Sequence, residues 1–289
     1  MRGATRLDWG DLTGWAEDDH AAGLAAWTRS GGAAPAGAGR DWVEARFVPW
    51  LLPAAHFTGY YEPELHGSPV RTDAFPVPIH AAPPMGIGAS RAEIEAGDLL
   101  AGQEIAWLAD EVDRFFLQVQ GSGRVRFPDG TVLRVGHAAK NGHPYRSVGA
   151  LLVERGVFAA DRITAQGVMD WLRADPARGR AAMRENPSYV MFRALRGGAA
   201  EDGPPGAMGV PVTEGRSLAV DPAVVPLGAL VWAEVDAPDP IRRLCAAQDV
   251  GSAIVGVGRA DLFCGTGDAA GRMAGALNHG GRMVVLEPA

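Results

Sequence analysis

The C-terminal part of the chain decides the fold, and it reads Leu244-Cys-Ala-Ala-Gln-Asp249-Val-Gly-Ser-Ala-Ile-Val-Gly-Val-Gly-Arg-Ala-Asp261-Leu-Phe-Cys-Gly-Thr-Gly267. This stretch contains two short apolar runs, and each has one carboxylate, Asp249 in the first and Asp261 in the second. A third carboxylate, Asp221, follows the apolar residues 218–220. An aspartate beside glycine is often only a turn former. Three carboxylates that each flank a strand-like run in one region favour a shared cleft instead.

Length and composition restrict the class of protein. The 289 residues favour one large or two modest domains, and an apolar content of 47% is enough for a sizeable core. The 39 glycines and 21 prolines indicate many loops and turns, as in β-rich folds. The net charge of −7 argues against nucleic acid as a partner.

The cysteine and histidine patterns predict neither a metal site nor a cofactor. The sequence contains no CxxC or HExxH motif, and its seven histidines are scattered. Cys245 and Cys264 lie in neighbouring strand-like runs, and the sequence leaves open whether they are paired. The residues after Met1 lack the apolar core of a signal peptide. We therefore expect either a cytosolic protein or a leader that is missing from this sequence.

Two stretches in the first half of the chain are typical of strands that carry polar side chains. In the first, Tyr60 and Tyr61 should point to opposite faces of a strand, one to the core and one, with Glu62, toward a cleft. In the second, residues 114–126, amide and hydroxyl side chains alternate with apolar ones, which predicts a strand with one polar face. Such a face suits a neutral polar ligand, although a solvated face would give the same pattern. The polar residues of this second stretch are Gln118, Gln120 and Ser122.

Five motifs in a fixed order carry a family resemblance. They resemble the membrane-bound lytic transglycosylase A family, which are murein-cleaving lyases, and the match runs from about residue 57 to the end. The terminal block also resembles the small domain named for three aspartates, whose positions match Asp221, Asp249 and Asp261. Ser252 stands where the family often has a second glycine. The motifs are Phe57-Thr-Gly-Tyr-Tyr-Glu-Pro63, Phe116-Leu-Gln-Val-Gln-Gly-Ser-Gly123, Asn141-Gly-x-Pro-Tyr-Arg-Ser147, Asn186-x-Ser-Tyr-Val-x-Phe192 and the aspartate-rich terminal block.

The resemblance implies a mainly β fold of two domains with few short helices. Residues 1–66 and 194–289 would form a double-psi β-barrel, with the three-aspartate region at about 206–289. Residues 67–193 would form a smaller inserted β domain, the other wall of a groove for a glycan strand. The Gly- and Pro-rich segment 196–209 is a candidate boundary.

The resemblance also implies the chemistry. Asp261 would be the acid/base that cleaves the β-1,4 bond between N-acetylmuramic acid and N-acetylglucosamine, with Asp249 as its supporting neighbour. A lytic enzyme uses the muramoyl C6 hydroxyl in place of water, so one carboxyl can serve twice, first as acid and then as base. Burial and the charge of Asp249 should raise the pKa of Asp261 from about 3.9. The expected substrate-binding residues are Tyr60, Tyr61, Gln118, Gln120, Ser122, Gly123, Tyr145, Ser188 and Asp221.

Location and partners follow from the same resemblance. Family members act outside the cytoplasm, so we expect a periplasmic monomer, associated with the outer membrane through a lipid-anchored leader absent from this sequence. Its partner would be the peptidoglycan glycan strand.

Three other functions compete with this one. A glycoside hydrolase would use water and a second carboxylate, which Glu62 or Asp249 could supply. A non-catalytic glycan-binding barrel would not need Asp261. The segment from Gly265 to Ala270 matches part of a dinucleotide fingerprint, but the chain ends before the further βαβ units could follow.

Overall fold

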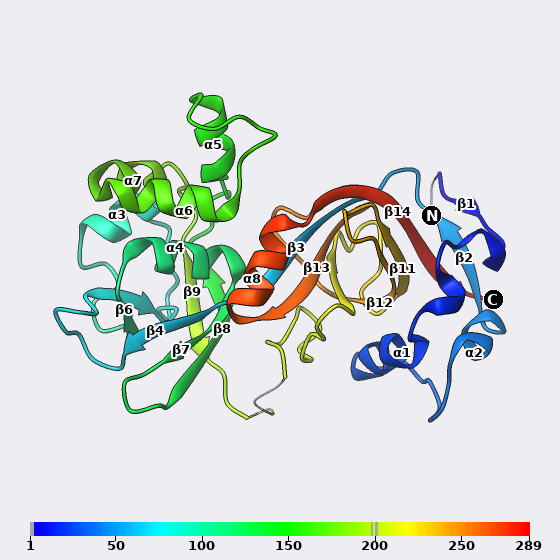
Figure 1. The fold of residues 1–289 in the computed structure, drawn as a ribbon. Helices are drawn as coiled ribbons and strands as arrows, with labels where there is room; N and C mark the ends of the chain where they lie inside the picture. Colours follow the sequence, from blue (N-terminus) through cyan, green and yellow to red (C-terminus); the bar gives the residue numbers. More distant parts are fainter. Residues whose placement is uncertain (1–2, 198, 200–201) are drawn as a thin grey trace. The chain divides into compact units, whose positions relative to one another are not determined.

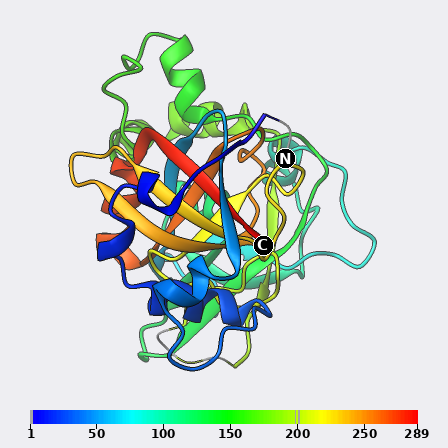
Figure 2. The same ribbon diagram turned by 90° about the vertical axis from the view of Figure 1, so that its right-hand side faces the viewer.

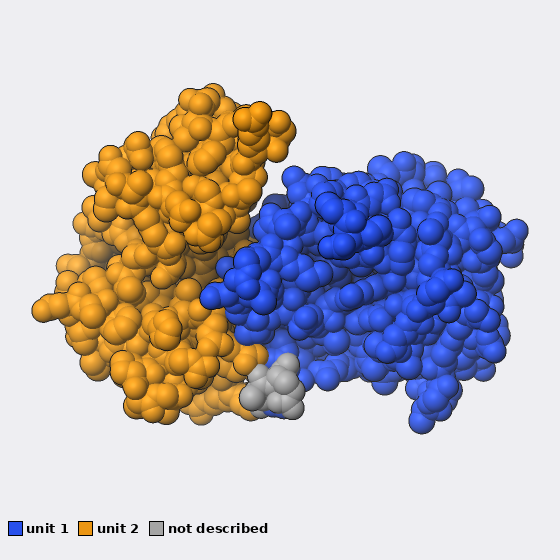
Figure 3. All heavy atoms as spheres, in the orientation of Figure 1, with its two compact units in different colours: residues 1–61, 199–289 blue, residues 62–198 orange. Residues whose placement is uncertain are grey.

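The structure is a computed structural model that describes residues 3–197, 199 and 202–289 (Figure 1). It divides the chain into unit 1, residues Met1–Tyr61 and Ala199–Ala289, and unit 2, residues Glu62–Gly198 (Figure 3). The boundaries predicted after residues 66 and 193 each lie five residues from these. Residues 198, 200 and 201 of the predicted linker lie outside the described residues.

The sheet of unit 1 closes on itself. Its eight strands pair in the order β1-β2-β14-β11-β12-β10-β13-β3, and β3 pairs with β14 as well (Figure 1 and Figure 2). The six strands from β14 to β3 therefore form a closed ring, and β1 and β2 extend it on the outside. The strands are β1 (Thr5–Arg6), β2 (Phe47–Leu51), β3 (His56–Glu62), β10 (Ser217–Val220), β11 (Leu230–Val235), β12 (Ile241–Asp249), β13 (Arg259–Thr266) and β14 (Asn278–Pro288).

Alternate residues of these strands belong to two different cores. One core draws buried side chains from all six ring strands, including Phe57, Val231 and Leu262, and so fills the interior of the ring. The other lies on the outer face of β11, β12 and β14, where Trp232 and Leu244 pack against the N-terminal segment. Strands that are buried on both faces give the nearly continuous apolar runs seen in the sequence.

The described residues of unit 1 form three α-helices, which lie at two ends of the unit. Helix α1 (His20–Arg29), capped by Asp19, packs on β12, and α2 (Arg40–Glu44) precedes β2. At the other end α8 (Gly267–Ala276) follows β13 (Figure 1). Gly265 and Gly267 have φ of +107° and +82°, a conformation that favours glycine, so these glycines make the tight turn from strand to helix. The next strand, β14, pairs antiparallel with β3 and β11 and closes the ring, so it does not extend the parallel sheet that the dinucleotide-binding alternative needs.

Unit 2 contains a six-stranded sheet and five helices. The sheet has the order β5-β6-β4-β7-β8-β9, and the helices cover it with their own apolar cluster. The strands are β4 (Glu64–Ser68), β5 (Val77–His80), β6 (Glu104–Leu108), β7 (Ser122–Arg126), β8 (Val132–Lys140) and β9 (Val190–Ala194). The helices are α3 (Arg91–Ala96), α4 (Glu111–Gln120), α5 (Val148–Glu154), α6 (Ala165–Ala174) and α7 (Pro176–Arg184).

The strand predicted over residues 114–126 is wrong in its first half. Residues 111–120 form helix α4, which begins at a cap from Asp110 to the N–H of Asp113 and ends at Gly121 in the left-handed conformation. Only the second half is a strand, β7, and it forms an antiparallel pair with β8. Gln118 and Gln120 are therefore helical residues, and they do not share a polar strand face with Ser122.

Both cysteines, Cys245 and Cys264, are free and buried. Burial raises the pKa of each thiol to about 12. In the part of the chain that the structure describes, no helix has the length and apolar character needed to span a membrane.

Candidate active site

Polar side chains gather on the outer face of the ring where β3, β12 and β13 lie. On β3, Phe57 points into the interior core, so Thr58 and Tyr60 point outward by strand alternation. On β13 the same alternation turns Ala260 and Leu262 inward and leaves Asp261 on the outer face.

Strand β10 lies between β12 and β13 and sets the two aspartates at one level. Ala219 of β10 pairs with Asp261 of antiparallel β13 and with Asp249 of parallel β12. Neighbouring strands are about 4.8 Å apart, so the two aspartate backbones are separated by about 10 Å.

A bulge in β12 brings Asp249 to this face. Leu218 pairs with Ala247, but the next residue, Ala219, pairs with Asp249, so Gln248 is an extra residue in β12. In a regular strand without the bulge, Asp249 would lie on the same face as Ala247 and would point into the interior core. The amide of Gln248 holds the bulge, because its Nε2 donates to the Ala26 carbonyl of α1 at 2.7 Å.

Asp261 is half-buried and held on one side by a hydroxyl. Its Oδ1 accepts a hydrogen bond of 2.6 Å from Thr58 Oγ1. Thr58 Oγ1 in turn accepts a hydrogen bond of 2.8 Å from Arg259 Nη2. Burial raises the pKa of Asp261 to about 6, and the charge of Asp249 adds to the rise. The Thr58 hydrogen bond and the Arg259 charge oppose it. The carboxyl group can therefore be either protonated or ionised near neutral pH.

Asp249 is bound on both of its oxygens. Oδ1 accepts from the N–H groups of Ala207 and Val250, each at 2.9 Å, and Oδ2 accepts from the Tyr60 hydroxyl at 3.1 Å. Burial raises the pKa of Asp249, whereas these hydrogen bonds lower it. The Tyr60 ring packs on Phe263 with centroids 5.2 Å apart, and burial raises the tyrosine pKa well above 10. Tyr60 therefore stays protonated and can only donate to Asp249.

Sequence reasoning missed Thr58 and Arg259. Both lie on the same strand face as a predicted residue, because Thr58 is two positions before Tyr60 and Arg259 two before Asp261. This two-residue spacing could have identified Thr58 and Arg259 from the sequence. The pairing of β3 with β13, which brings the two side chains together, joins residues about 200 positions apart in sequence and has no local signature.

The third aspartate, Asp221, has a different task. Its Oδ2 accepts from the Gly256 N–H at 2.7 Å, and its Oδ1 accepts from the Ala223 N–H at 2.9 Å. These hydrogen bonds lower its pKa. Asp221 thereby anchors the segment 250–258, which connects the strands of Asp249 and Asp261. We find Asp221 to be a loop anchor, and its predicted contact with substrate stays a prediction.

Tyr61 and Glu62 follow Tyr60 on β3 and point elsewhere. Tyr61 packs on α8 beside Cys264 and Ala270. Glu62 is fully buried and forms ion pairs with Arg124 at 2.7 Å and Arg134 at 3.7 Å. A carboxylate held in this way is no candidate for a second catalytic group, and the expectation that Glu62 faces a cleft is wrong.

The other predicted residues belong to unit 2, and three of them have buried side chains. Gln118 is 5% exposed and its Nε2 donates to the Val190 carbonyl at 2.9 Å, while Ser188 is equally buried. Ser122 is buried on β7, and a side chain at Gly123 would overlap Leu117. Gln120 ends α4 and is half-buried. Tyr145 is 36% exposed and borders a pocket of about 210 Å³.

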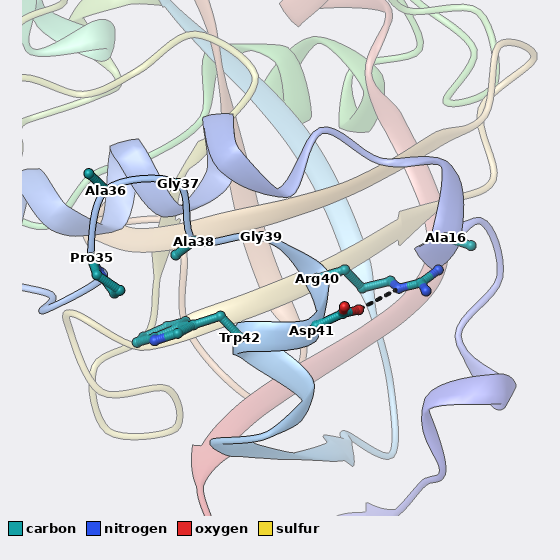
Figure 4. A pocket seen from close by; sticks show the side chains of 9 residues that line it. All are labelled: Ala16, Pro35, Ala36, Gly37, Ala38, Gly39, Arg40, Asp41 and Trp42. Carbon is teal, nitrogen blue, oxygen red and sulfur yellow. Dashed lines mark ion pairs between the residues drawn. The ribbon is translucent and has the colours of Figure 1, made fainter.

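A pocket of about 580 Å³ in unit 1 does not contain the aspartates. It is lined by the segment 35–42 and Ala16, near α2, and includes Trp42 and the ion pair of Arg40 and Asp41 at 3.6 Å (Figure 4). Within residues 3–197, 199 and 202–289, no group of three His, Cys, Asp or Glu side chains gathers in a way that could hold a metal ion.

Comparison with known proteins adds a family to this geometry. The model of the MltA specific insert domain matches residues 56–87 and 85–193, and the model of the 3D domain matches residues 216–287. The chain is 37% identical over 244 residues to the membrane-bound lytic murein transglycosylase A of Escherichia coli K12, which covers 81% of this chain and 66% of that relative. The chain thus spans slightly less than two thirds of the length of this relative.

Solved structures match over almost the full length. The membrane-bound lytic murein transglycosylase from Agrobacterium tumefaciens is 30% identical with a TM-score of 0.88, covering 99% of this chain and 97% of that one. Escherichia coli MltA with bound chitohexaose is 30% identical with a TM-score of 0.80, covering 100% and 92%. The chain therefore belongs to the membrane-bound lytic murein transglycosylase A family.

Proposed function

We propose that this protein is a lytic transglycosylase that cleaves the β-1,4 bond between N-acetylmuramic acid and N-acetylglucosamine and leaves 1,6-anhydromuramoyl ends. One observation carries the proposal: Asp261 is a half-buried carboxyl group that is held by Thr58, lies at the same level of the sheet as a second carboxyl group, Asp249, and has a pKa raised to about 6. The relatives' names and the chitohexaose-bound Escherichia coli structure support a glycan substrate.

The reaction needs one group that first gives and then takes a proton. Protonated Asp261 donates its proton to the glycosidic oxygen as the bond from C1 to that oxygen breaks. The resulting carboxylate then accepts the proton of the muramoyl C6 hydroxyl while O6 bonds to C1. The two steps restore the starting protonation state of Asp261. A pKa of about 6 suits both steps, since neither form is strongly disfavoured near neutral pH.

In this proposal Asp249 stabilises the transition state and takes no proton. Three hydrogen bonds fix its carboxyl group, which leaves it poorly placed to activate a water molecule. Its negative charge favours the positive character that develops at C1 as the bond breaks. The same charge helps to keep Asp261 protonated.

The hydrolase alternative is weaker because neither proposed second carboxylate is free. Glu62 is buried in ion pairs, and Asp249 is bound on both oxygens. The intramolecular C6 hydroxyl also has a high effective concentration compared with water.

We further propose that the ring of six strands is a double-psi β-barrel, as the family resemblance implies. Its support is the closed set of pairings from β14 to β3. The relatives are named membrane-bound, which supports a periplasmic location with outer-membrane association, and a lipid anchor and a monomeric state remain part of the proposal. The predicted role of residues 67–193 as a wall of the glycan groove also stays a prediction.

The test is digestion of purified murein in water enriched in heavy oxygen, followed by mass analysis of the muramoyl ends. We expect anhydromuramoyl ends without label, and Asp261→Asn should abolish their formation. Label in the new ends would establish a hydrolase. Intact murein that still binds the protein would favour the glycan-binding alternative.

A further inference from the structure

The hydrogen bonds around Thr58 have a fixed direction. A guanidinium group can only donate, so Thr58 Oγ1 must accept the 2.8 Å hydrogen bond from Arg259 Nη2. A threonine hydroxyl has a single hydrogen, and here it lies toward Asp261 Oδ1 at 2.6 Å. The order of donation therefore runs from Arg259 to Thr58 and from Thr58 to Asp261.

Arg259 cannot easily turn to release this arrangement. Its Nη1 donates to the Ala260 carbonyl at 2.6 Å and to the His56 carbonyl at 3.4 Å, so both flanking strands hold the guanidinium. Asp261 and Arg259 lie on one strand, and Thr58 lies on the paired strand. The geometry is thus built into the backbone pairing of β3 with β13.

When Asp261 is protonated, Oδ1 accepts the Thr58 hydrogen bond and is therefore the carbonyl oxygen of the carboxyl group, so the proton is on Oδ2. We propose that Thr58 and Arg259 form a positioning pair that assigns the mobile proton of Asp261 to Oδ2. The single atom Oδ2 then donates to the glycosidic oxygen and later accepts from the C6 hydroxyl. This inference rests on the proposed function, and it adds that proton transfer always uses the same oxygen.

The pair also sets the pH range of the acid form. The charged and titratable groups that face Asp261 are Arg259 and Cys264 on β13, Asp249 on β12 and Tyr60 on β3. The Thr58 hydrogen bond stabilises the ionised carboxylate and lowers its pKa. Removal of the hydroxyl therefore raises this pKa and extends the protonated form to higher pH.

The decisive variant is Thr58→Val, which replaces the hydroxyl by a methyl group of similar size. We expect kcat to fall about tenfold with little change in KM, since positioning is lost but sugar contacts remain. The alkaline limb of the pH profile should move up by about one unit, the amount that one hydrogen bond to a charged group can produce. Thr58→Ser keeps the hydroxyl and should restore both values. Thr28→Val is the matched control, because Thr28 lies on α1 and its hydroxyl donates to the Leu24 carbonyl at 2.8 Å.

Carbon-13 NMR of labelled aspartate gives a readout that needs no substrate. The pKa of Asp261 should be higher in Thr58→Val than in wild type, Thr58→Ser and Thr28→Val. A second variant, Arg259→Met, should shift this pKa less in the Thr58→Val background than in wild type, because part of its effect passes through the hydroxyl. If the two substitutions shifted the pKa of Asp261 additively, the proposed positioning pair would be overturned. An unchanged pKa of Asp261 together with an unchanged kcat in Thr58→Val would overturn it as well. If wild type made no anhydro ends, the proposed function would fall, while the NMR comparison would still decide the direction of the hydrogen bonds.

Discussion

At the scale of single residues, the carboxyl group of Asp261 lowers the stability of the folded protein at neutral pH. Its pKa is about 6 in the folded state and about 3.9 when the chain is unfolded. Between these values the folded state binds more protons, so stability falls as pH rises from about 4 to about 6. Above that range the ionised group destabilises the fold by about 2–3 kcal/mol.

The first prediction uses this linkage. Asp261→Asn should abolish turnover and yet raise the melting temperature at pH 7, because the amide carries no buried charge and can still accept from Thr58. Calorimetry at pH 7 and pH 4 measures the effect. The gain should disappear at pH 4, where Asp261 is protonated in the folded protein. A variant that is less stable than wild type at pH 7 would contradict the pKa of about 6.

Some of the residues predicted to share a site do lie together in the structure, while their roles stay predictions. Asp249, Asp261 and Tyr60 were predicted as site residues, and the structure brings them together. Asp221 was placed with them because of its neighbours in the sequence, but its oxygens bind loop N–H groups. Whether a carboxylate receives hydrogen bonds from the backbone depends on loop conformation, which side-chain patterns do not encode.

At the scale of elements, helix α4 shows how two periodicities can be confused. Alternating apolar and polar residues predict a strand, but the same stretch also repeats apolar residues at helical spacing, as at Val112 and Phe115. The caps, Asp110 before the helix and Gly121 after it, favour the helix. Similarly, the bulge at Gln248 that turns Asp249 outward could not be predicted, since it depends on pairing with β10.

The second prediction follows from the corrected position of Gln118. Gln118→Ala should destabilise the protein by about 1–2 kcal/mol, because it removes a buried hydrogen bond to the Val190 carbonyl. Chemical denaturation measures the loss, and Gln166→Ala, at an exposed position of α6, is the matched control. Glycan affinity should stay unchanged in both variants. A loss of affinity without a loss of stability would restore the original substrate-binding role.

At the scale of the whole molecule, the predicted division after residues 66 and 193 came from the order of the family motifs, and the structure divides the chain five residues away from each boundary. The strand pairings that close the ring could not be predicted, because β3 and β14 are separated by all of unit 2. Each apolar cluster of the described residues lies within one unit: three in unit 1 and three in unit 2.

The third prediction concerns this separation. Residues 62–198 alone should fold into a stable domain, since they contain a complete sheet and their own clusters. A cooperative thermal transition by circular dichroism would be the expected result. Residues 199–289 alone, which lack β3, provide the comparison and should not fold. A disordered insert would show that its cores depend on unit 1.

The closed ring also determines when the protein can first act. Thr58 belongs to the early part of the chain, and Asp261 emerges from the ribosome some 200 residues later. Strand β14 follows the other strands of the ring in the sequence, and its pairing with β3 and β11 completes the circuit. A partly synthesised or C-terminally clipped chain therefore has no assembled site. The cleavage proposed for this protein would therefore have to wait until β14 has been made and has paired with β3.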